Sequence, residues 1–182
     1  HEFVTTATMD KGGINDLFAK LADSHADQYK DVVTNLTRLG FETATRMGSS
    51  VSLNDLISVV DKKKIFSDFE KKIDAIRRGP GTKQQKTQQI NKEYELFTKA
   101  LEKAIIDAGI KNNQTLAKVI KSGARGSSAQ LRQTIASPVV FSDNKGRPMT
   151  QFLIHNSFAD GLSLPEYLLH SYGTRIGLAQ TK

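Results

Sequence analysis

The sequence predicts a mainly α-helical protein with short β segments, in which a helical hairpin precedes a loop-rich C-terminal portion that ends in a helix. Three observations predict this class. Apolar residues recur every three or four positions between residues 13 and 108, as on one face of a helix. The tripeptide Gly79-Pro80-Gly81 marks a turn between two such stretches. The segment after Ser137 instead predicts two short extended pieces joined by a turn.

Composition limits the classes of protein that remain open. The sequence has 182 residues, no cysteine and a formal net charge of +7. Disulfides and thiolate metal sites are therefore excluded, and a reducing compartment fits. The positive charge favours an anionic partner, the alternative being a basic surface without a specific partner. No apolar run approaches the ~18 residues of a membrane-spanning helix, so we expect no membrane partner.

Residues 1–54 form the first expected segment, a helical N-terminal part. The periodicity predicts helix over 13–47, with stops at Gly40 and Gly48, and Asn54 is placed to cap a following helix. His1-Glu2-Phe3 resembles neither a signal peptide nor a transit peptide, and we expect the chain to be a piece of something longer.

Residues 55–110 form the second expected segment, the hairpin. Because each apolar stripe is narrow, the two arms are expected to bury their stripes against each other. The stripes consist of Ile65, Phe69, Ile73 and Ile76 in the first arm and Ile90, Tyr94, Phe97, Leu101 and Ile105 in the second. Lysine and arginine crowd the outer faces, which are either simply solvated or line a channel that passes phosphates. These residues are Lys62, Lys63, Lys64, Lys71, Lys72, Arg77, Arg78, Lys83 and Lys86.

Residues 111–182 form the third expected segment. A short helix is predicted over 116–120, a turn over 142–146, and a longer helix from Leu164 to Ala179. Gly173 and Gly177 lie within this last helix, where each glycine costs ~1 kcal/mol. Their spacing indicates either close packing or a helix that must bend.

The run from Ser122 to Gln133 is the most informative part of the chain. Gly123 and Gly126 allow positive φ and a close approach of the backbone to a ligand. Arg125 between them presents a planar, permanently charged group suited to phosphate. By chemistry alone, both a phosphate-contacting loop and an exposed turn that caps a helix remain open. No catalytic constellation emerges elsewhere, and His25, His155 and His170 have no metal-ligand spacing.

The same run resembles a segment, S-G-A-R-G-S-x-x-Q-x-x-Q, of the largest subunit of multisubunit DNA-directed RNA polymerases, called beta prime in bacteria. Four further segments resemble that family in order and approximate spacing, so the resemblance covers about Thr5 to Lys182. They are Leu39-Gly40-Phe41-Glu42-Thr43-Ala44-Thr45, Ser50-Val51-Ser52-Leu53-Asn54-Asp55-Leu56, Phe158-Ala159-Asp160-Gly161-Leu162-Ser163-Leu164-Pro165-Glu166-Tyr167 and Tyr172-Gly173-Thr174-Arg175-Ile176-Gly177-Leu178-Ala179.

The resemblance implies a role for each segment. Residues 1–54 would be funnel-like, and the hairpin would form the rim helices of the secondary channel. Arg125 would contact the triphosphate of the incoming nucleotide. Residues 130–149 would be the F-loop, and 164–182 the start of the bridge helix. The residues implied to support the active centre are Ser122, Gly123, Gly126, Gln130, Arg132 and Gln133, and those implied on the bridge helix are Tyr172, Gly173, Arg175 and Gly177.

The resemblance also implies cofactor, partners and location. Mg²⁺ would be held in the complete enzyme by an aspartate triad outside this chain, so the isolated chain is expected to be inactive, with no catalytic or metal residue of its own. Expected partners are the other polymerase subunits, template DNA, RNA and nucleoside triphosphates. The expected location is the cytoplasm, that of the host for a viral enzyme, with a plastid also open.

Two departures from the family pattern stand out. Where the family's F-loop continues G-M-R-G-L-M, this chain has Ala136-Ser137-Pro138-Val139-Val140-Phe141, and Pro138 must alter the local backbone. Where the family has D-T-A, this chain has Gln180-Thr181-Lys182. Such divergence fits a distant member, such as a viral polymerase with a subdivided largest subunit; plastid-type polymerases also divide this subunit. The alternative function is a non-catalytic basic helical module that binds nucleic acid or a polymerase partner.

Overall fold

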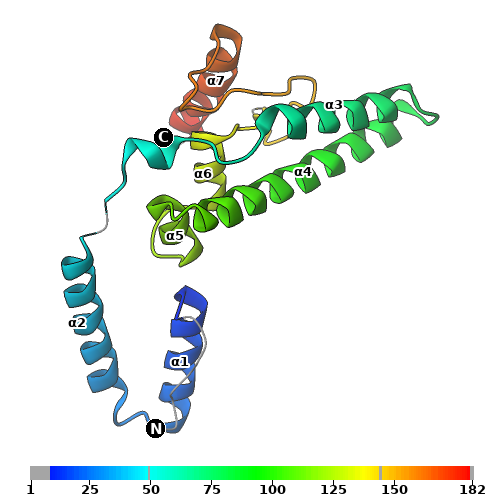
Figure 1. Ribbon diagram of the computed structural model, residues 1–182. Coiled ribbons are helices and arrows are strands. Elements are labelled where there is room, and N and C mark those ends of the chain that lie inside the picture. The colour runs from blue at the N-terminus through cyan, green and yellow to red at the C-terminus, as the bar shows by residue number, and fades with distance from the viewer. Residues whose placement is uncertain (1–8, 49, 144, 181–182) are drawn as a thin grey trace.

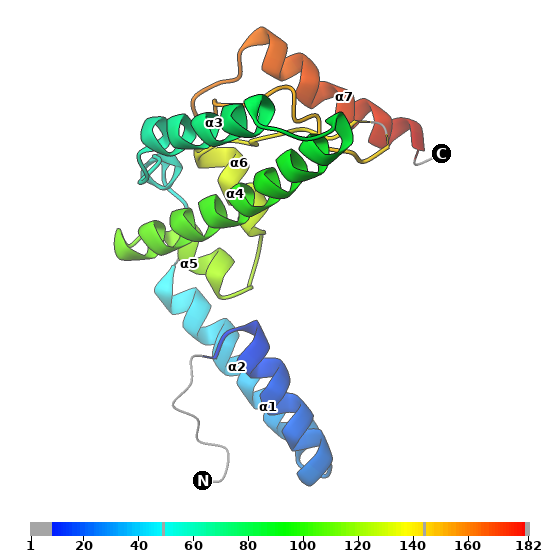
Figure 2. The ribbon, with the colours of Figure 1, turned by 90° about the vertical axis from the view of Figure 1, so that its right-hand side faces the viewer.

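A computed structural model describes residues 9–48, 50–143 and 145–180. His1-Glu2-Phe3, Thr5, Asn144 and Thr181-Lys182, on which some expectations rest, lie outside the described residues. The described part is 67% helical, so the mainly α class is confirmed. Figures 1 and 2 show an N-terminal pair of helices that projects from a larger body, in which a long hairpin lies between a short helix on one side and the last helix on the other.

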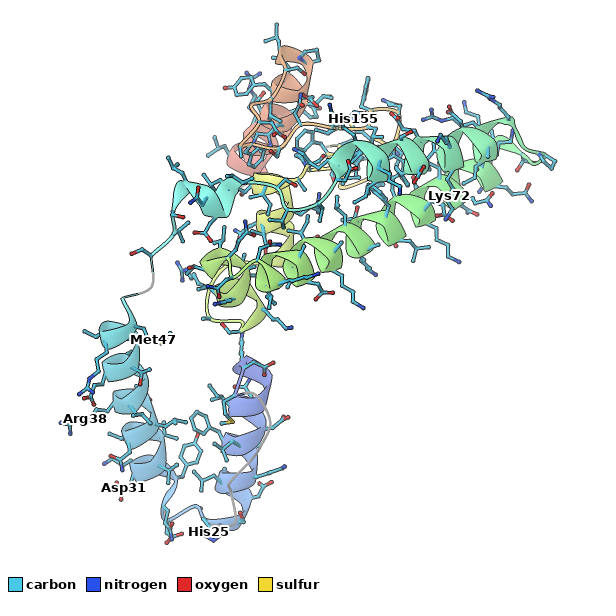
Figure 3. All side chains as sticks on the ribbon, in the orientation of Figure 1. His25, Asp31, Arg38, Met47, Lys72 and His155 are labelled. Atoms are coloured by element: carbon cyan, nitrogen blue, oxygen red, sulfur yellow. The ribbon has the colours of Figure 1, made fainter. Side chains whose placement is uncertain are left out.

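The N-terminal pair consists of α1 (Lys11–Ser24) and α2 (Tyr29–Met47). The prediction of one helical stretch over 13–47 was wrong at residues 25–28, where the chain turns and neither glycine nor proline signals a break. Gly48 ends α2 with φ 57°, as expected, whereas Gly40 lies inside the helix and stops nothing. Asp31 and Arg38 point away from α1 (Figure 3), and α2 buries none of its residues.

A short 3₁₀ helix, η1 (Leu53–Leu56), links this pair to the hairpin. Its cap is Ser52 and not Asn54, because the side chain of Asp55 accepts hydrogen bonds from the N–H and the hydroxyl of Ser52 at 2.9 and 3.1 Å. Asp55 is buried, and the hydrogen bond from the Ser52 N–H holds its pKa below the ordinary value.

The hairpin is formed by α3 (Lys62–Arg78) and α4 (Lys83–Lys111), joined at the expected turn. The first arm begins at Lys62, capped by Asp61, and not at residue 55. Four aromatic rings fill the seam, among them Phe66, which the predicted stripe omitted. Phe69 stacks on Phe97 at 4.0 Å, and meets Tyr94 edge-on at 4.9 Å.

The outer face of the hairpin is mixed in charge. Lys72 pairs with Glu93 across the hairpin at 2.6 Å, Lys71 with Asp68 at 3.6 Å, and Arg77 with Asp74 at 3.6 Å. Lys62 pairs with Asp160, at the far end of the chain. Acidic neighbours therefore offset part of the basic surface that the lysine and arginine count suggested.

Two short helices, α5 (Thr115–Lys121) and α6 (Ser128–Ile135), pack against the second half of α4. Gly109 permits the closest of these approaches, since an added Cβ would lie 2.6 Å from the Cβ of Ala117. The core joins the hairpin seam to these helices and the following turn. Its buried members include Leu101, Ile105, Leu131, Ile135 and Val139.

A long loop leads from α6 to α7 (Leu164–Gln180), the expected last helix. The expected short β segments appear within the described residues only as two isolated antiparallel bridges, Val139 with Ile154 and Ser142 with Pro148. The turn that connects Ser142 to Pro148 is closed by Asp143, whose N–H donates to the Arg147 carbonyl at 2.8 Å.

Several elements begin with one local device. The N–H of a serine or threonine donates a hydrogen bond to an acidic or amide side chain three residues later. In the described residues this occurs at Ser52–Asp55, Thr82–Gln85, Ser127–Gln130, Ser157–Asp160 and Ser163–Glu166.

Candidate functional site

The loop between α5 and α6 carries the run that the sequence singled out. Gly123 and Gly126 both adopt the expected positive φ, 74° and 81°. Gly123 is required for a second reason: a Cβ there would lie 2.9 Å from the Cβ of Lys11, at the start of α1. The Lys11 N–H donates to the carbonyl of Ser122 at 3.0 Å. The first residue of α1 therefore closes one side of this loop.

Arg125 is exposed on this loop, and within the described part of the chain its guanidinium has neither a hydrogen-bond nor an ion-pair partner. A permanently charged fork held by two glycines in left-handed conformation can reach a bound anion. The geometry suits a phosphate contact, and the role itself remains a prediction.

The C-terminal end of the loop is fixed by Ser127 and Gln130. The Ser127 N–H donates to Oε1 of Gln130 at 3.0 Å, and the Gln130 N–H donates to Oγ of Ser127 at 3.2 Å. Ser127 thus caps α6, and Gln130 completes the capping box. The backbone carbonyl of Gln133 accepts from the N–H of Phe158 at 3.0 Å, which ties α6 to the turn before α7.

Arg132 is buried and points inward. Its Nε lies 3.1 Å from Oε1 of Glu102 on α4, and its Nη1 donates to the carbonyls of Ser137, at 2.8 Å, and Pro138. No sequence pattern singled out Glu102, which is separated from Arg132 by 30 positions.

The turn that Arg132 holds contains an unusual backbone conformation. Val139 has φ 66°, which is a strained conformation for a β-branched residue, and its side chain is fully buried. The Val140 N–H donates to the Pro138 carbonyl at 2.8 Å, closing a tight turn around Val139. Val139 stands where the family's G-M-R-G-L-M has its second glycine, a residue that would adopt this φ without strain.

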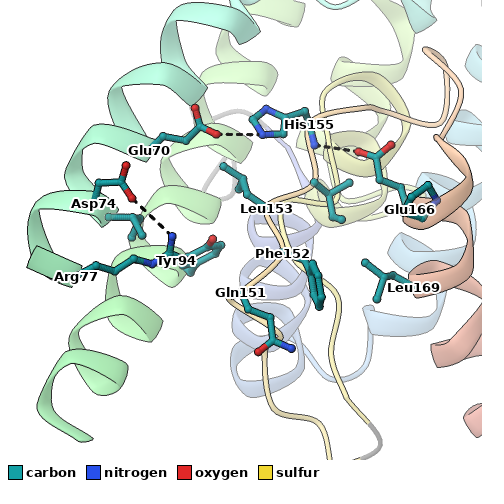
Figure 4. Close-up of a pocket in the computed structure, with 13 residues that line it drawn as sticks. Glu70, Asp74, Arg77, Tyr94, Gln151, Phe152, Leu153, His155, Glu166 and Leu169 are labelled. Carbon is teal, nitrogen blue, oxygen red and sulfur yellow. Dashed lines mark hydrogen bonds and ion pairs between the residues drawn. The ribbon is translucent and has the colours of Figure 1, made fainter. Parts of the chain in front are cut away.

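A cleft of about 640 Å³ lies on the other side of the hairpin (Figure 4). The hairpin supplies Glu70, Asp74, Arg77 and Tyr94 to it, and the loop before α7 supplies residues 151–155. His155 lies 3.2 Å from Glu70 through Nε2. Sequence analysis missed this cleft, because its walls come from segments more than 50 residues apart that share no motif.

Glu166, in the first turn of α7, closes one end of the cleft. Partial burial by itself would raise its pKa, but hydrogen bonds from Ser163 and Asn156 outweigh that effect and lower the pKa to about 2. The donors are the N–H and hydroxyl of Ser163, at 2.9 and 2.7 Å, and Nδ2 of Asn156 at 2.8 Å. Glu166 is therefore a structural carboxylate that joins the loop to α7.

The residues expected on the bridge-type helix lie on α7, away from the Arg125 loop. Both views place α6 and the hairpin between α7 and that loop, so the chain does not bring the two groups together. Tyr172, Gly173, Arg175 and Gly177 are all exposed. Among the described residues, a Cβ at Gly173 or Gly177 would meet no atom within 4 Å, so close packing against those residues does not explain the two glycines.

The described residues contain no group of three His, Cys, Asp or Glu side chains that could hold a metal ion. Nor does any helix among them have the length and apolar character needed to cross a membrane.

No family model matches this chain, but it is similar in sequence to several known proteins. It is 29% identical over 182 residues to subunit beta' of Clavibacter michiganensis DNA-directed RNA polymerase, and 30% identical over 172 residues to that of Streptomyces coelicolor. It is 31% identical over 183 residues to subunit beta'' of Chlamydomonas reinhardtii. These alignments cover 96%, 90% and 96% of this chain, but only 14%, 13% and 6% of the relatives.

These relatives are all subunits of DNA-directed RNA polymerases. More particularly, the chain is homologous to one stretch of the beta' subunit, which in the Chlamydomonas relative lies in a chain named beta''.

Proposed function

We propose that this chain is a fragment or split subunit of a DNA-directed RNA polymerase. In the assembled enzyme it would contribute the wall of the secondary channel and part of the active-centre wall for template-directed nucleotidyl transfer. The observation that carries this proposal is the Arg125 loop, with its two left-handed glycines, in a chain whose similarity to beta' subunits extends over at least nine-tenths of its length.

Arg125 would bind the triphosphate of the incoming nucleotide. The loop supports this role because the guanidinium is exposed and unpaired within the described residues, and because Lys11 and the Ser127–Gln130 cap fix both sides of the loop. A charge-assisted hydrogen bond to phosphate is one of the stronger polar contacts that a side chain forms.

The other segments would surround this contact. The α3–α4 hairpin would form the rim of the secondary channel, residues 130–149 the F-loop, and α7 the start of the bridge helix. Mg²⁺ would be bound by a part of the enzyme outside this chain, where it would stabilise the transferring phosphoryl group. No step of that chemistry is assigned to the residues described here.

The proposed partners are the remaining polymerase subunits, template DNA, the RNA product and nucleoside triphosphates. We place the assembled enzyme in a cytoplasm, that of the host if a virus encodes it; a plastid is the other compartment that a beta''-type relative suggests.

Purification of the native complex through a tag on this chain tests the proposal directly. We expect it to recover chains that carry the rest of the beta' sequence and to support template-dependent RNA synthesis, whereas the pure chain supports none. Recovery of the chain alone, together with nucleic acid, would instead favour the basic helical module. The paired charges on α3 and α4 weigh against that second function.

Within the assembled enzyme, Arg125→Ala tests the substrate contact. The loss of one charge-assisted bond is expected to raise the apparent KM for nucleotides by roughly 10- to 100-fold, with little change in template binding. Arg38→Ala, on the outer side of α2, is the matched control and should leave the KM unchanged. An unaltered nucleotide dependence of Arg125→Ala would exclude this residue as a substrate contact.

A further inference from the structure

We propose that Glu102 of α4 and Arg132 of α6 are a positioning pair that sets where α7 begins relative to the hairpin. The inference rests on the proposed function only where α7 is taken as the start of the bridge helix. The contacts that connect the pair to α7 all lie within this chain. They form one continuous series from α4 to the first turn of α7.

The series of contacts begins at the Glu102 carboxylate, both of whose oxygens have a partner. Oε1 of Glu102 lies 3.1 Å from Nε of Arg132, and Oε2 accepts from the hydroxyl of Ser128 at 2.7 Å. The side chains of Arg132 and Glu102 are only 8% and 19% exposed. A buried guanidinium requires such a partner, because an uncompensated buried charge is strongly destabilising.

The far end of the same guanidinium holds the strained turn. Nη1 of Arg132 donates to the carbonyls of Ser137 and Pro138, the two residues directly before Val139. A strained φ persists only where the surroundings determine it, and these bonds are part of those surroundings. Arginine has enough donors in one plane to reach a carboxylate and two carbonyls together, whereas lysine has a single ammonium.

From the turn the series passes to the segment before α7. The Ser137 hydroxyl donates to the Ile154 carbonyl and accepts from the Val139 N–H at 2.8 Å. The Ile154 N–H donates to the Val139 carbonyl at 2.9 Å. The residues that follow, His155 and Asn156, donate their N–H groups to Oε1 of Glu166 in the first turn of α7, both at 3.3 Å.

α7 depends on this loop for its position. Among the described elements, α4 packs extensively on α5 and α6, whereas α7 packs on no other helix to a comparable extent. Its contacts run to the loop instead: His170 lies between the rings of Phe141 and Phe158, with centroid distances of 5.2 and 5.0 Å. A change in the loop backbone therefore moves the start of α7.

Hydrogen–deuterium exchange on the full 182-residue chain tests the linkage. In Glu102→Gln we expect the amides of Val139, Ile154 and Asn156 to exchange at least about tenfold faster, while amides near the hairpin tip change less than about twofold. Glu93→Gln is the matched control, since Glu93 also forms an ion pair, with Lys72, but lies outside the series. A uniform increase over the whole chain, or the same pattern in Glu93→Gln, would overturn the proposal.

Two conservative variants keep the test decisive if Glu102→Gln does not fold. Glu102→Asp keeps the charge with a shorter reach, and Arg132→Lys keeps the charge without the fork. Both should accelerate exchange at the same three amides, by less than Glu102→Gln does. Protection equal to the wild type in both variants would show that the pair does not hold the turn.

The assembled enzyme supplies a separate readout. Glu102→Asp should lower the rate of nucleotide addition at saturating nucleotide and leave the apparent KM within about twofold, the opposite of the pattern for Arg125→Ala. If exchange changes locally as expected but the addition rate does not, the positioning pair stands and the bridge-helix assignment of α7 is wrong. If neither changes, the positioning pair itself is wrong.

Discussion

The rings of Phe69 and Phe97 stack at a centroid distance of 4.0 Å and an interplanar angle of 15°, which joins the two arms of the hairpin at the middle of their seam. This contact, together with the edge-on approach of Tyr94, belongs to the same core cluster as the buried residues of α4, α5 and α6.

A charge placed in this seam should separate the arms. Phe69→Asp is expected to lower the free energy of unfolding by about 3–5 kcal/mol, because it removes a buried ring and leaves a carboxylate without a partner. Lys71→Glu, on the exposed face of the same helix, should change it by less than about 0.5 kcal/mol. Urea denaturation followed by circular dichroism measures both, and equal losses would mean that the faces are wrongly assigned.

Alanine substitutions at Gly123 and Gly146 allow the cost of backbone strain to be measured apart from the cost of a steric contact. Both have φ 74°, but among the described residues a Cβ at Gly146 meets no atom within 4 Å, whereas one at Gly123 meets Lys11. Gly146→Ala should therefore lose about 1 kcal/mol of stability from strain alone. Gly123→Ala should lose about 1 kcal/mol more and release α1 from the loop. Thermal denaturation measures the two losses, and a smaller loss for Gly123→Ala would show that the Lys11 contact is not formed.

At Val139, a substitution by glycine should be less destabilising than one by alanine, the reverse of the usual order. Both substitutions remove the buried side chain, but only glycine also relieves the strain at φ 66°. We expect Val139→Gly to be more stable than Val139→Ala by about 1 kcal/mol. The neighbouring Val140, whose φ is not positive, is the control, and there glycine should be the worse of the two. The same order at both positions, measured by urea denaturation, would rule out strain at Val139.

Glu166 should make stability depend on pH in the acid range. Its pKa is lowered from 4.5 to about 2 in the folded chain, so its contribution is fully present above pH 4.5 and is lost as the pH falls towards 2. Allowing for solvent screening, Glu166→Gln should reduce stability by about 1–2 kcal/mol near pH 6. The difference from the wild type should vanish only as the pH falls through 2. Unfolding midpoints measured across this range check the sign, with the exposed Glu95→Gln as the control.

The hairpin, the Gly79–Gly81 turn, the positive φ of two loop glycines and the last helix could be predicted from the sequence, because each depends on a local pattern of three to four residues. The break between α1 and α2 could not, since Ala26 and Asp27 carry no breaking signal. The first arm was placed too early because the apolar residues before Lys62 belong to η1 and the segment that follows it, and Asp61, which caps α3, was not recognised as a cap.

The candidate site divides in the same way. Arg125, Gly123 and Gly126 lie within four residues of one another, so the loop that they form could be predicted from the sequence. Glu102, which explains why Arg132 is buried, lies on another helix, and its position beside the core is decided only by how α4, α5 and α6 pack. The cleft that His155 helps to line could not be predicted for the same reason, since the hairpin and the stretch from 151 to 169, which form its walls, lie more than 50 residues apart.

The paired side chains that begin η1, α4, α6, α7 and the turn at Ser157 have a consequence for the order in which this chain folds. Each pair spans three residues, so it closes a very small loop, whereas the Phe69–Phe97 contact must close a far longer one. The boundaries of these elements are therefore encoded independently of one another and form on the timescale of single helical turns. The folding rate is therefore limited by the formation of long-range contacts, such as that between Glu102 and Arg132. These contacts join segments whose ends are already defined.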